Sequence, residues 1–291
     1  MKVGLVVLPT DEWPLAGEQF AFAEQAGFAS VWTYDHLVWG GMPDGPWHAA
    51  YPLLAAAAVG TSRVRLGTLV TSPNFRHPVG LAREVITLDH LSAGRFELGI
   101  GAGSVGPDAE VLGGPTWSAA ERAARFAEFV ELLDVLLREP VTDRTGTYYS
   151  ATRAVMVPGC VQSPRVPFTV AATGRRSLDV VARLGHRWVT TGPTGPGPHA
   201  PAAVHDAVAR QSALLDEACA AVGRDPATIG RVLLLMAVDH GLTSPEAFDD
   251  LAGRYGELGI GEIVLHHPRQ TGPFGGDIAV FEEIARRHAD P

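Results

Sequence analysis

The sequence predicts a (β/α)8 TIM barrel, and two observations support this fold class. Short apolar, β-branched runs of the kind found in buried parallel strands recur eight times, and each precedes a segment with helical spacing of apolar residues. The composition does not change abruptly along the 291 residues, a length near the roughly 250 residues typical of this barrel. We therefore expect one domain over residues 1–291. A doubly wound sheet is the alternative, but such sheets rarely contain eight consecutive βα units.

Eight strands and eight helices account for most of the chain. The expected strands are the runs at residues 2–8, 29–34, 64–70, 95–101, 167–172, 187–191, 231–238 and 261–267. The expected helices are at residues 14–26, 51–59, 79–91, 117–137, 173–185, 202–222, 245–255 and 278–288. Gly27 and Gly223 stand directly after two of these helices, where glycine commonly ends a helix. In this fold the functional site is expected at the C-terminal ends of the strands.

Residues 64–104 contain the clearest βαβ unit of the chain. Two strand-forming runs flank a helix whose apolar residues form one stripe, which must pack against the sheet. These apolar residues are Val79, Leu81, Ala82, Val85, Ile86, Leu88 and Leu91. The two strands are followed by residues 71–74 and 101–104, which form poor strands but good ligand contacts. Function is therefore expected at these two ends.

Irregular stretches interrupt the series at four places. Residues 37–48 are rich in glycine, proline and tryptophan, and loops of this length in a compact domain are usually lids or binding loops. Residues 105–115 are a second irregular stretch, and residues 192–201 are expected to be a flexible loop. Residues 142–167 contain several turn residues. We interpret this last stretch as a short hairpin inserted between the fourth and fifth barrel strands, not as a linker between domains.

The composition favours small-molecule partners. The formal net charge of −9 argues against a general surface for nucleic acid or anionic membrane. Cys160 and Cys219 are far apart and are expected to be free thiols of a reducing compartment. The N-terminus does not resemble a signal peptide, and no segment approaches the ~18 apolar residues of a membrane span. We therefore expect a cytoplasmic protein. We also expect no metal site, because no spacing of His and Glu residues is typical of one.

Asp35 and His36 end the strand at 29–34 and place a carboxylate and an imidazole at the barrel mouth. A histidine there can donate a hydrogen bond or exchange a proton near neutral pH, and the adjacent acid can orient it. The alternative is a loop cap beside a solvated histidine. From the residues alone, this pair is the candidate for proton transfer.

Two further strand ends are candidate binding segments. Thr71 and the residues up to Asn74 offer hydroxyls and an amide to a polar ring edge, or they form an ordinary turn. The run GIGAGS at 99–104 superficially resembles a dinucleotide-binding motif, but the third glycine is absent at the required spacing. We expect its glycines to let a flat ring lie close to the backbone.

The run AATGRRS at 171–177 carries the clearest signal for an anion. It places a hydroxyl, a flexible glycine and two arginines at the start of a helix, where free N–H groups and the helix dipole attract anions. Thr190 and Thr191 end the neighbouring strand. His266 and His267 end the strand at 261–267, but adjacent side chains of a strand point to opposite faces and do not readily share one metal ion.

With these residues assembled, the sequence resembles the luciferase-like monooxygenase superfamily, specifically its branch of coenzyme F420-dependent oxidoreductases. The resemblance covers nearly the whole chain. Its most specific segments are AEQAGFASVWTYDHL, RLGTLVTSPNFRHPVGLAREVITLDHLSAGRFELGIGAG and AATGRRSLDVVARLG. It implies a TIM barrel with a flavin or deazaflavin across its C-terminal mouth, and a non-proline cis peptide bond that matches Leu69–Val70.

The resemblance also implies a set of site residues. Asp35 and His36 match an Asp-His pair of sugar-phosphate dehydrogenases in this branch, and Trp39 lies near the position of their active-site Trp. Ser104 stands where those enzymes carry an acidic Glu, which argues against a sugar-phosphate substrate. The expected cofactor-binding residues are Asp35, Leu69, Val70, Thr71, Gly101, Ala102, Gly103, Ala172, Thr173, Gly174, Arg175, Arg176 and Thr191. The expected substrate contacts are Trp39, Trp47, Ser104 and His266, together with the loop at 192–200.

The leading hypothesis is therefore reversible hydride transfer between F420 and a small organic substrate, with His36 exchanging the accompanying proton and Asp35 orienting it. The alternatives are an FMN-dependent monooxygenase supplied by a separate reductase, a non-catalytic flavin-binding protein, and a cofactor-free barrel lyase or isomerase. The resemblance also leads us to expect a homodimer.

Overall fold

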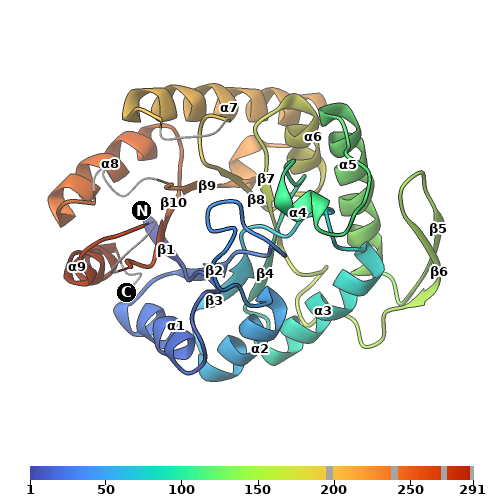
Figure 1. The fold of residues 1–291 in the computed structure, drawn as a ribbon. Helices are drawn as coiled ribbons and strands as arrows, with labels where there is room; N and C mark the ends of the chain where they lie inside the picture. Colours follow the sequence, from blue (N-terminus) through green and yellow to red (C-terminus); the bar gives the residue numbers. More distant parts are fainter. Residues whose placement is uncertain (195–198, 237–241, 270–273, 289–291) are drawn as a thin grey trace.

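The chain forms a closed barrel of eight parallel strands, in a computed structural model that describes residues 1–194, 199–236, 242–269 and 274–288. Hydrogen-bonded neighbours around the barrel follow the order β1-β10-β9-β8-β7-β4-β3-β2. The strands are β1 (Lys2–Val6), β2 (Ser30–Thr33), β3 (Arg65–Thr68), β4 (Phe96–Gly101), β7 (Phe168–Ala171), β8 (Arg187–Thr190), β9 (Gly230–Leu234) and β10 (Glu262–His266). The predicted (β/α)8 barrel is confirmed (Figure 1).

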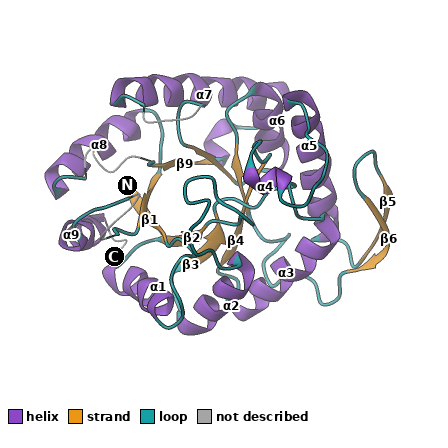
Figure 2. Ribbon diagram, viewed as in Figure 1, coloured by secondary structure: helices purple, strands orange, loops and turns teal. Residues whose placement is uncertain are grey.

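Helices surround the barrel and connect successive strands (Figure 2). They are α1 (Leu15–Ala26), α2 (Ala50–Gly60), α3 (Pro78–Leu91), α4 (Pro107–Glu110), α5 (Ala119–Leu136), α6 (Arg175–Leu184), α7 (Pro201–Ala221), α8 (Pro245–Glu257) and α9 (Ile278–His288), with a 3-10 turn η1 (Pro226–Thr228). The predicted helices agree with these bounds to within two residues, α4 and η1 excepted. The outer helix ring covers the sheet and leaves the strand ends free to carry ligand contacts.

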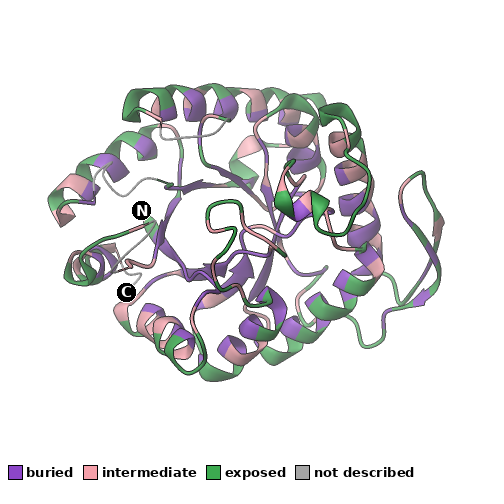
Figure 3. Cartoon of the chain, in the orientation of Figure 1, coloured by how far each residue is buried: buried purple, intermediate pink, exposed green. Residues whose placement is uncertain are grey.

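Alternating side chains of the strands build two apolar layers. Val6 and Trp32 point into the barrel, whereas their neighbours Leu5 and Val31 pack outward against the helices. This arrangement follows from the two-residue period of a strand, and both layers exclude water. Figure 3 shows the result, with buried strands and with helices that are buried only on their inner faces.

Helix ends follow the predicted local signals. Gly27 ends α1 in the left-handed region at a φ of 90°, and its N–H bonds to the carbonyl of Ala23. Ser118 and Glu121 form a reciprocal capping box at the start of α5, which satisfies two backbone N–H groups that the helix cannot satisfy. Such ends orient the strand-to-helix turns around the mouth of the barrel.

The predicted insertion between the fourth and fifth barrel strands is a two-stranded hairpin. It consists of β5 (Val141–Thr145) and β6 (Ser150–Val155), which pair antiparallel and project from the side of the barrel beside α5 (Figure 1). The hairpin therefore lies away from the strand ends that carry the candidate site residues.

The structure differs from the prediction at two loops. Residues 107–110 within the expected irregular stretch form the short helix α4. The strand predicted at 231–238 ends at Leu234, and residues 237 and 238 lie outside the described residues, as do residues 195–198 of the predicted substrate loop.

A network of buried charges closes the N-terminal end of the barrel. Glu97 and Glu262 are buried, and Arg187 forms ion pairs with both. The hydroxyl of Ser30 donates a 2.5 Å hydrogen bond to Glu262. Because buried charges must be paired and hydrogen-bonded, these side chains are committed to the barrel itself. A cavity of about 450 Å³ at this end is lined by the same charged side chains, whereas the cavity at the opposite, C-terminal end has a largely apolar lining.

Candidate active site

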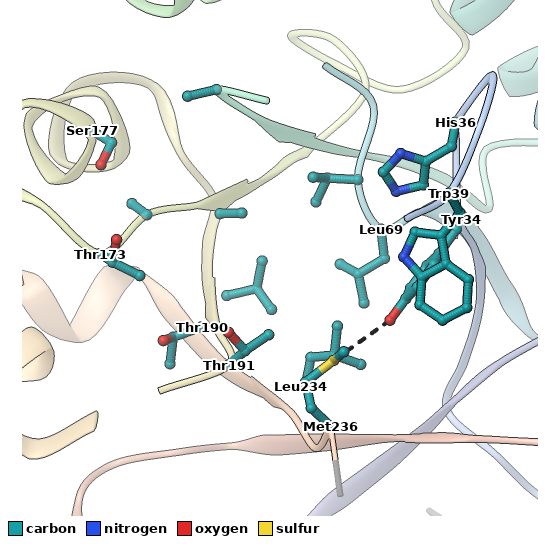
Figure 4. A pocket seen from close by; sticks show the side chains of 15 residues that line it. Tyr34, His36, Trp39, Leu69, Thr173, Ser177, Thr190, Thr191, Leu234 and Met236 are labelled. Carbon is teal, nitrogen blue, oxygen red and sulfur yellow. Dashed lines mark hydrogen bonds between the residues drawn. The ribbon is translucent and has the colours of Figure 1, made fainter. Parts of the chain in front are cut away.

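A cavity of about 380 Å³ opens at the C-terminal end of the barrel. Its lining residues are Tyr34, His36, Trp39, Leu69, Val70, Ala102, Ala171, Ala172, Thr173, Ser177, Val189, Thr190, Thr191, Leu234 and Met236. Figure 4 shows the aromatic and imidazole side chains on one side and the hydroxyls of Thr173 and Ser177 on the opposite side. The cavity thus has an apolar lining between two polar edges, one at His36 and one at Thr173 and Ser177. Many of its residues were singled out from the sequence.

The extended chain after β2 separates Asp35 from its two neighbours. Tyr34 and His36 both line the cavity, whereas Asp35 is only 1% exposed and its carboxylate is bound by Arg76 and Thr71. Adjacent side chains of an extended segment point in opposite directions, which explains this arrangement. The prediction that Asp35 orients His36 is therefore wrong.

Asp35 instead forms the centre of a buried network behind the cavity. Nε and Nη2 of Arg76 donate hydrogen bonds to its two carboxylate oxygens at 2.9 and 2.7 Å, and the hydroxyl of Thr71 donates another at 2.8 Å. Although burial alone would lower it, these contacts raise the pKa of Arg76 above its ordinary value. Asp35 and Thr71, both predicted to bind cofactor, are occupied in supporting the segment that follows β3.

The carboxylate nearest to His36 is Asp108 of α4. Nδ1 of His36 lies 3.3 Å from Oδ2 of Asp108, and the N–H of Leu37 donates a 2.6 Å hydrogen bond to Oδ1. Burial would raise the pKa of Asp108, but the contacts with His36 and Leu37 outweigh it and lower that pKa below its ordinary value. An ionised acid therefore stands beside the imidazole, from a loop distant in sequence.

An aromatic cluster forms the wall beside His36. Trp39 packs against Tyr34, with ring centroids 5.6 Å apart, and Trp47 lies against both Trp39 and His36. Phe274 stacks between Trp39 and the ring of His266. Of the two tryptophans predicted to contact substrate, Trp39 lines the cavity, whereas Trp47 does not line it and packs against Trp39 and His36.

His266 lies behind this wall and does not line the cavity. Its Nδ1 is 3.2 Å from the carbonyl oxygen of Leu235, which can only accept, so Nδ1 carries the proton and Nε2 accepts the hydroxyl of Tyr34 at 2.7 Å. Burial lowers the pKa of His266 to about 3 and raises that of Tyr34 well above its ordinary value. The Tyr34 hydroxyl also lies 3.6 Å from the sulfur of Met236 (Figure 4). His266 thus holds Tyr34, and the substrate contact predicted for it is not supported.

The segment after β3 forms one side of the cavity. Leu69 and Val70 both line it, and the peptide bond between them is cis, which confirms the position that the family resemblance implied. The Thr71 N–H donates a 2.8 Å hydrogen bond to the carbonyl of Gly99, and Thr71 accepts one from the Gly101 N–H at 2.9 Å. These bonds attach the Leu69–Val70 segment to β4.

The glycines of β4 serve this contact between strands more than they serve a ligand. A Cβ at Gly99 would meet the carbonyl oxygen of Thr68 at 1.8 Å, and one at Gly101 would meet a methyl group of Val70 at 2.7 Å. Gly103 has a φ of 72° and faces Asn74. In this run only Ala102 lines the cavity. Gly101 and Gly103 do not line the cavity, so the ring contacts predicted for them remain predictions, whereas their close contacts with Val70 and Asn74 give them a steric role.

Ser104 is exposed and does not line the cavity. Its carbonyl oxygen accepts a 3.1 Å hydrogen bond from the side chain of Asn74. The substrate contact predicted for Ser104 thus has no support from its position.

The start of α6 forms the polar edge opposite His36. Ala172, Thr173 and Ser177 line the cavity. Gly174 is the N-cap of α6, and because glycine has no side chain, no N-cap side chain binds the first N–H groups of the helix. Arg175 and Arg176 are exposed at this edge, and Arg175 pairs with Glu217 at 2.8 Å. The amide groups and the guanidinium groups together can receive an anion.

Several residues of the site were missed in the sequence. Tyr34 could have been found, because it lies two residues before His36 and must share its face of the extended chain. Asp108 could not, since it lies in a stretch without periodicity, and its distance from His36 depends on how the loop after β4 folds over the loop after β2. Arg76 likewise gave no signal.

Neither a metal centre nor a membrane segment occurs in the part of the chain that the structure describes. No group of three or more His, Cys, Asp or Glu side chains within it could hold a metal ion. None of its helices is long and apolar enough to cross a membrane.

Comparison with known proteins places these features in a family. The sequence model of the luciferase-like monooxygenase family matches residues 3–250. An F420-dependent glucose-6-phosphate dehydrogenase of Beutenbergia cavernae is 38% identical over 190 residues, which is 62% of this chain and 56% of that protein. An F420-dependent hydroxymycolic acid dehydrogenase of Mycobacterium tuberculosis is 32% identical over 220 residues, 74% of this chain and 56% of the relative. The chain thus spans about half the length of the curated relatives it matches.

A solved structure supports the fold across the whole chain. An F420-dependent secondary alcohol dehydrogenase in complex with an F420-acetone adduct superimposes with a TM-score of 0.81 at 18% identity, covering 98% of this chain and 99% of that one. At this identity the likeness is evidence for the fold. Given the match of the family model over most of its length, the chain belongs to the luciferase-like monooxygenase family.

Proposed function

We propose that this protein is an F420-dependent oxidoreductase that transfers a hydride between the deazaflavin and a small organic substrate. The observation that carries the proposal is one cavity bounded by His36, by the Leu69–Val70 segment and by the start of α6. Family membership and the two F420-dependent relatives support it.

The residues of the cavity fit a deazaflavin. Leu69, Val70, Ala102, Ala171 and Val189 offer an aliphatic surface to a flat ring. Thr173, Ser177, the free amides of α6 and Arg176 offer donors to a phosphate at the opposite edge. Thr190 and Thr191 add hydroxyl groups between them. A deazaflavin with a phosphate group needs both an apolar surface for its ring and an anion-binding edge for its phosphate, and the cavity provides the two.

When bound, F420 supplies the hydride donor or acceptor, and the protein supplies orientation and proton transfer. His36 is the residue lining the cavity whose imidazole can accept or donate the proton that accompanies the hydride. Tyr34 and Trp39 would exclude water and hold the substrate against the deazaflavin ring. Asp35, through Arg76 and Thr71, keeps the wall at Leu69–Val70 in place.

The cavity favours an uncharged substrate. Among the described residues that line it there is no lysine or arginine to receive a substrate phosphate. Ser104, where the sugar-phosphate enzymes carry an acid, is exposed outside it. We therefore propose an alcohol, carbonyl, imine or alkene substrate in preference to glucose 6-phosphate, although several relatives are glucose-6-phosphate dehydrogenases.

A monooxygenase is the second candidate, because the chain belongs to the luciferase-like monooxygenase family. Its use of reduced FMN is an expectation from the sequence resemblance. Such an enzyme would need oxygen and a separate reductase. A non-catalytic flavin-binding protein would bind cofactor without turnover. The homodimer remains a prediction from the family resemblance.

Turnover assays under anaerobic conditions test the proposal. The protein is incubated with F420 and a panel of alcohols, and with reduced F420 and a panel of carbonyls, imines and alkenes, while the cofactor absorbance is followed. We expect turnover with at least one apolar substrate and a loss of about 100-fold or more in His36→Ala, the usual scale of general acid–base catalysis. Turnover that requires oxygen and FMN would favour the second candidate.

A further inference from the structure

We propose that Asp108 is the positioning residue of His36: its carboxylate holds the proton on Nδ1 and leaves Nε2 free toward the cavity. The proposal rests on the function assigned to His36 above but concerns a carboxylate that the sequence does not single out. Asp108 is 8% exposed and belongs to α4, more than seventy residues from His36 along the chain.

The contacts of Asp108 divide between its two oxygens. Oδ1 accepts hydrogen bonds from the N–H groups of Leu37 at 2.6 Å and Val38 at 3.3 Å. Oδ2 lies 3.3 Å from Nδ1 of His36. One oxygen therefore anchors the loop that follows His36, and the other faces the ring itself.

Nδ1 of His36 has no alternative partner among the described residues. The atom is buried and has no well-formed hydrogen bond, and Oδ2 of Asp108 at 3.3 Å is the acceptor that it faces, so the accessible edge of the ring is that of Nε2. Tyr34 and Trp47 contact the ring edge-on, at centroid distances of 6.0 Å each. The neighbouring acid, Asp35, is turned away and held by Arg76. Within the described residues, the ion pair found for His36 is the one with Asp108.

The chemistry follows from what a carboxylate can do. An ionised carboxylate only accepts hydrogen bonds, so it selects the tautomer with the proton on Nδ1. Nε2 then carries the lone pair and can take a proton from a substrate in the cavity. The imidazolium formed in this step is stabilised by the negative charge of Asp108. When the reaction runs in reverse, the same ion pair returns the proton from Nε2.

Asp108→Asn separates the two tasks of this side chain. The asparagine carbonyl can still accept the bonds from Leu37 and Val38, while its NH2 group replaces the oxygen that faces Nδ1. Because an NH2 group donates, it selects the opposite tautomer, with the proton on Nε2. The matched control is Asp89→Asn. Asp89 is also a buried aspartate that accepts hydrogen bonds from two backbone N–H groups, those of Val161 and Gln162, and it does not line the cavity.

The test is ¹⁵N NMR of the histidine rings in the cofactor-free protein at pH 8, with the His36 signals assigned by their loss in His36→Gln. We expect the Nδ1–H tautomer for His36 in the wild type and in Asp89→Asn, and the Nε2–H tautomer in Asp108→Asn. In the loaded enzyme, Asp108→Asn should lower kcat about 100-fold with less than a threefold change in cofactor affinity.

The wild-type spectrum alone can overturn the proposal. An Nε2–H tautomer of His36 in the unaltered protein, or the same tautomer in wild type and a folded Asp108→Asn variant, would show that Asp108 does not position the ring. If the tautomers behave as expected but no F420-dependent turnover is found, the proposed function fails and the role of Asp108 as the tautomer-setting residue stands.

Discussion

Arg76 holds the carboxylate of Asp35 with two hydrogen bonds, of 2.9 and 2.7 Å, directly behind the cavity wall. The guanidinium group also lies 4.4 Å over the ring of Tyr51, whose hydroxyl is 3.0 Å from that of Thr71. Asp35 is nearly inaccessible, whereas the side chain of Arg76 is 17% exposed and also pairs with Glu84, so the ion pair is largely buried on the side of the acid. The Arg76–Asp35 pair thus joins the segments that follow β2 and β3, which form part of the cavity.

Removing Arg76 should therefore be costly. Arg76→Met leaves the Asp35 charge buried without its partner, and we expect a loss of about 3–5 kcal/mol in the free energy of unfolding. Urea denaturation followed by circular dichroism measures it. Arg286→Met removes an exposed ion pair with Glu283 and should change stability by less than about 1 kcal/mol. Equal effects of the two substitutions would contradict the buried role of the Arg76–Asp35 pair.

Stability should fall in mild acid because His266 is buried in its neutral form. Its pKa is lowered to about 3, whereas in the unfolded chain it is about 6.5. The unfolded state therefore takes up a proton below pH 6.5 that the folded state does not, so stability is complete above pH 6.5 and declines as the pH falls toward 3. At pH 5 this group alone costs about 2 kcal/mol.

A comparison of pH slopes isolates this contribution. His266→Gln keeps an acceptor for the Tyr34 hydroxyl and removes the titrating ring. We expect its unfolding free energy to lose about 2 kcal/mol less than the wild type between pH 8 and pH 5. Parallel stability curves for the two proteins would show that His266 is protonated in the folded state.

The β4 glycines should be sensitive to a single methyl group. In Gly101→Ala the new Cβ would meet the Val70 methyl at 2.7 Å, so we expect a loss of about 1–3 kcal/mol. The loss should be smaller in a Val70→Ala background, where that methyl is absent. Gly80→Ala, in α3 with no atom near the added Cβ, should be neutral or stabilising by about 0.5–1 kcal/mol. An additive double variant would contradict the steric role of Gly101.

The two arginines at the start of α6 should differ in their contribution to cofactor affinity. Arg175 is already paired with Glu217, whereas Arg176 makes no ion pair within the described residues. We expect Arg176→Gln to weaken F420 binding about fivefold, roughly 1 kcal/mol, and Arg175→Gln to have a smaller effect. Both effects should shrink as salt is added. Fluorescence titration at two salt concentrations measures both affinities. If neither substitution changed the affinity for F420, the start of α6 would not be part of the cofactor site.

Periodicity and turn residues in the sequence were enough to predict the barrel. Alternating strand residues such as Leu5 and Val6, and the glycine after α1, act locally, so they can be read without knowing what packs nearby. The inserted hairpin was predictable for the same reason. These features depend on neighbours in sequence.

Contacts between loops were not predictable in this way. Asp35 and His36 were grouped because they are adjacent, but an extended chain turns adjacent side chains apart, and Arg76 and Asp108 provide their respective partners. Gly101 was assigned to a ligand, whereas its space is needed by Val70 of the neighbouring strand end. In each case the partner lies on another loop at the barrel mouth, and its position follows only from the closed sheet.

Direct titration with cofactor tests the central claim, that the cavity between His36 and α6 binds a deazaflavin. The purified protein is titrated with F420 and, separately, with FMN, each followed by the change in cofactor fluorescence, with Arg176→Gln as the site-specific variant. We expect saturable binding of F420 that is tighter than that of FMN and is weakened by the substitution. Tighter binding of FMN, or no binding of either cofactor, would contradict the account.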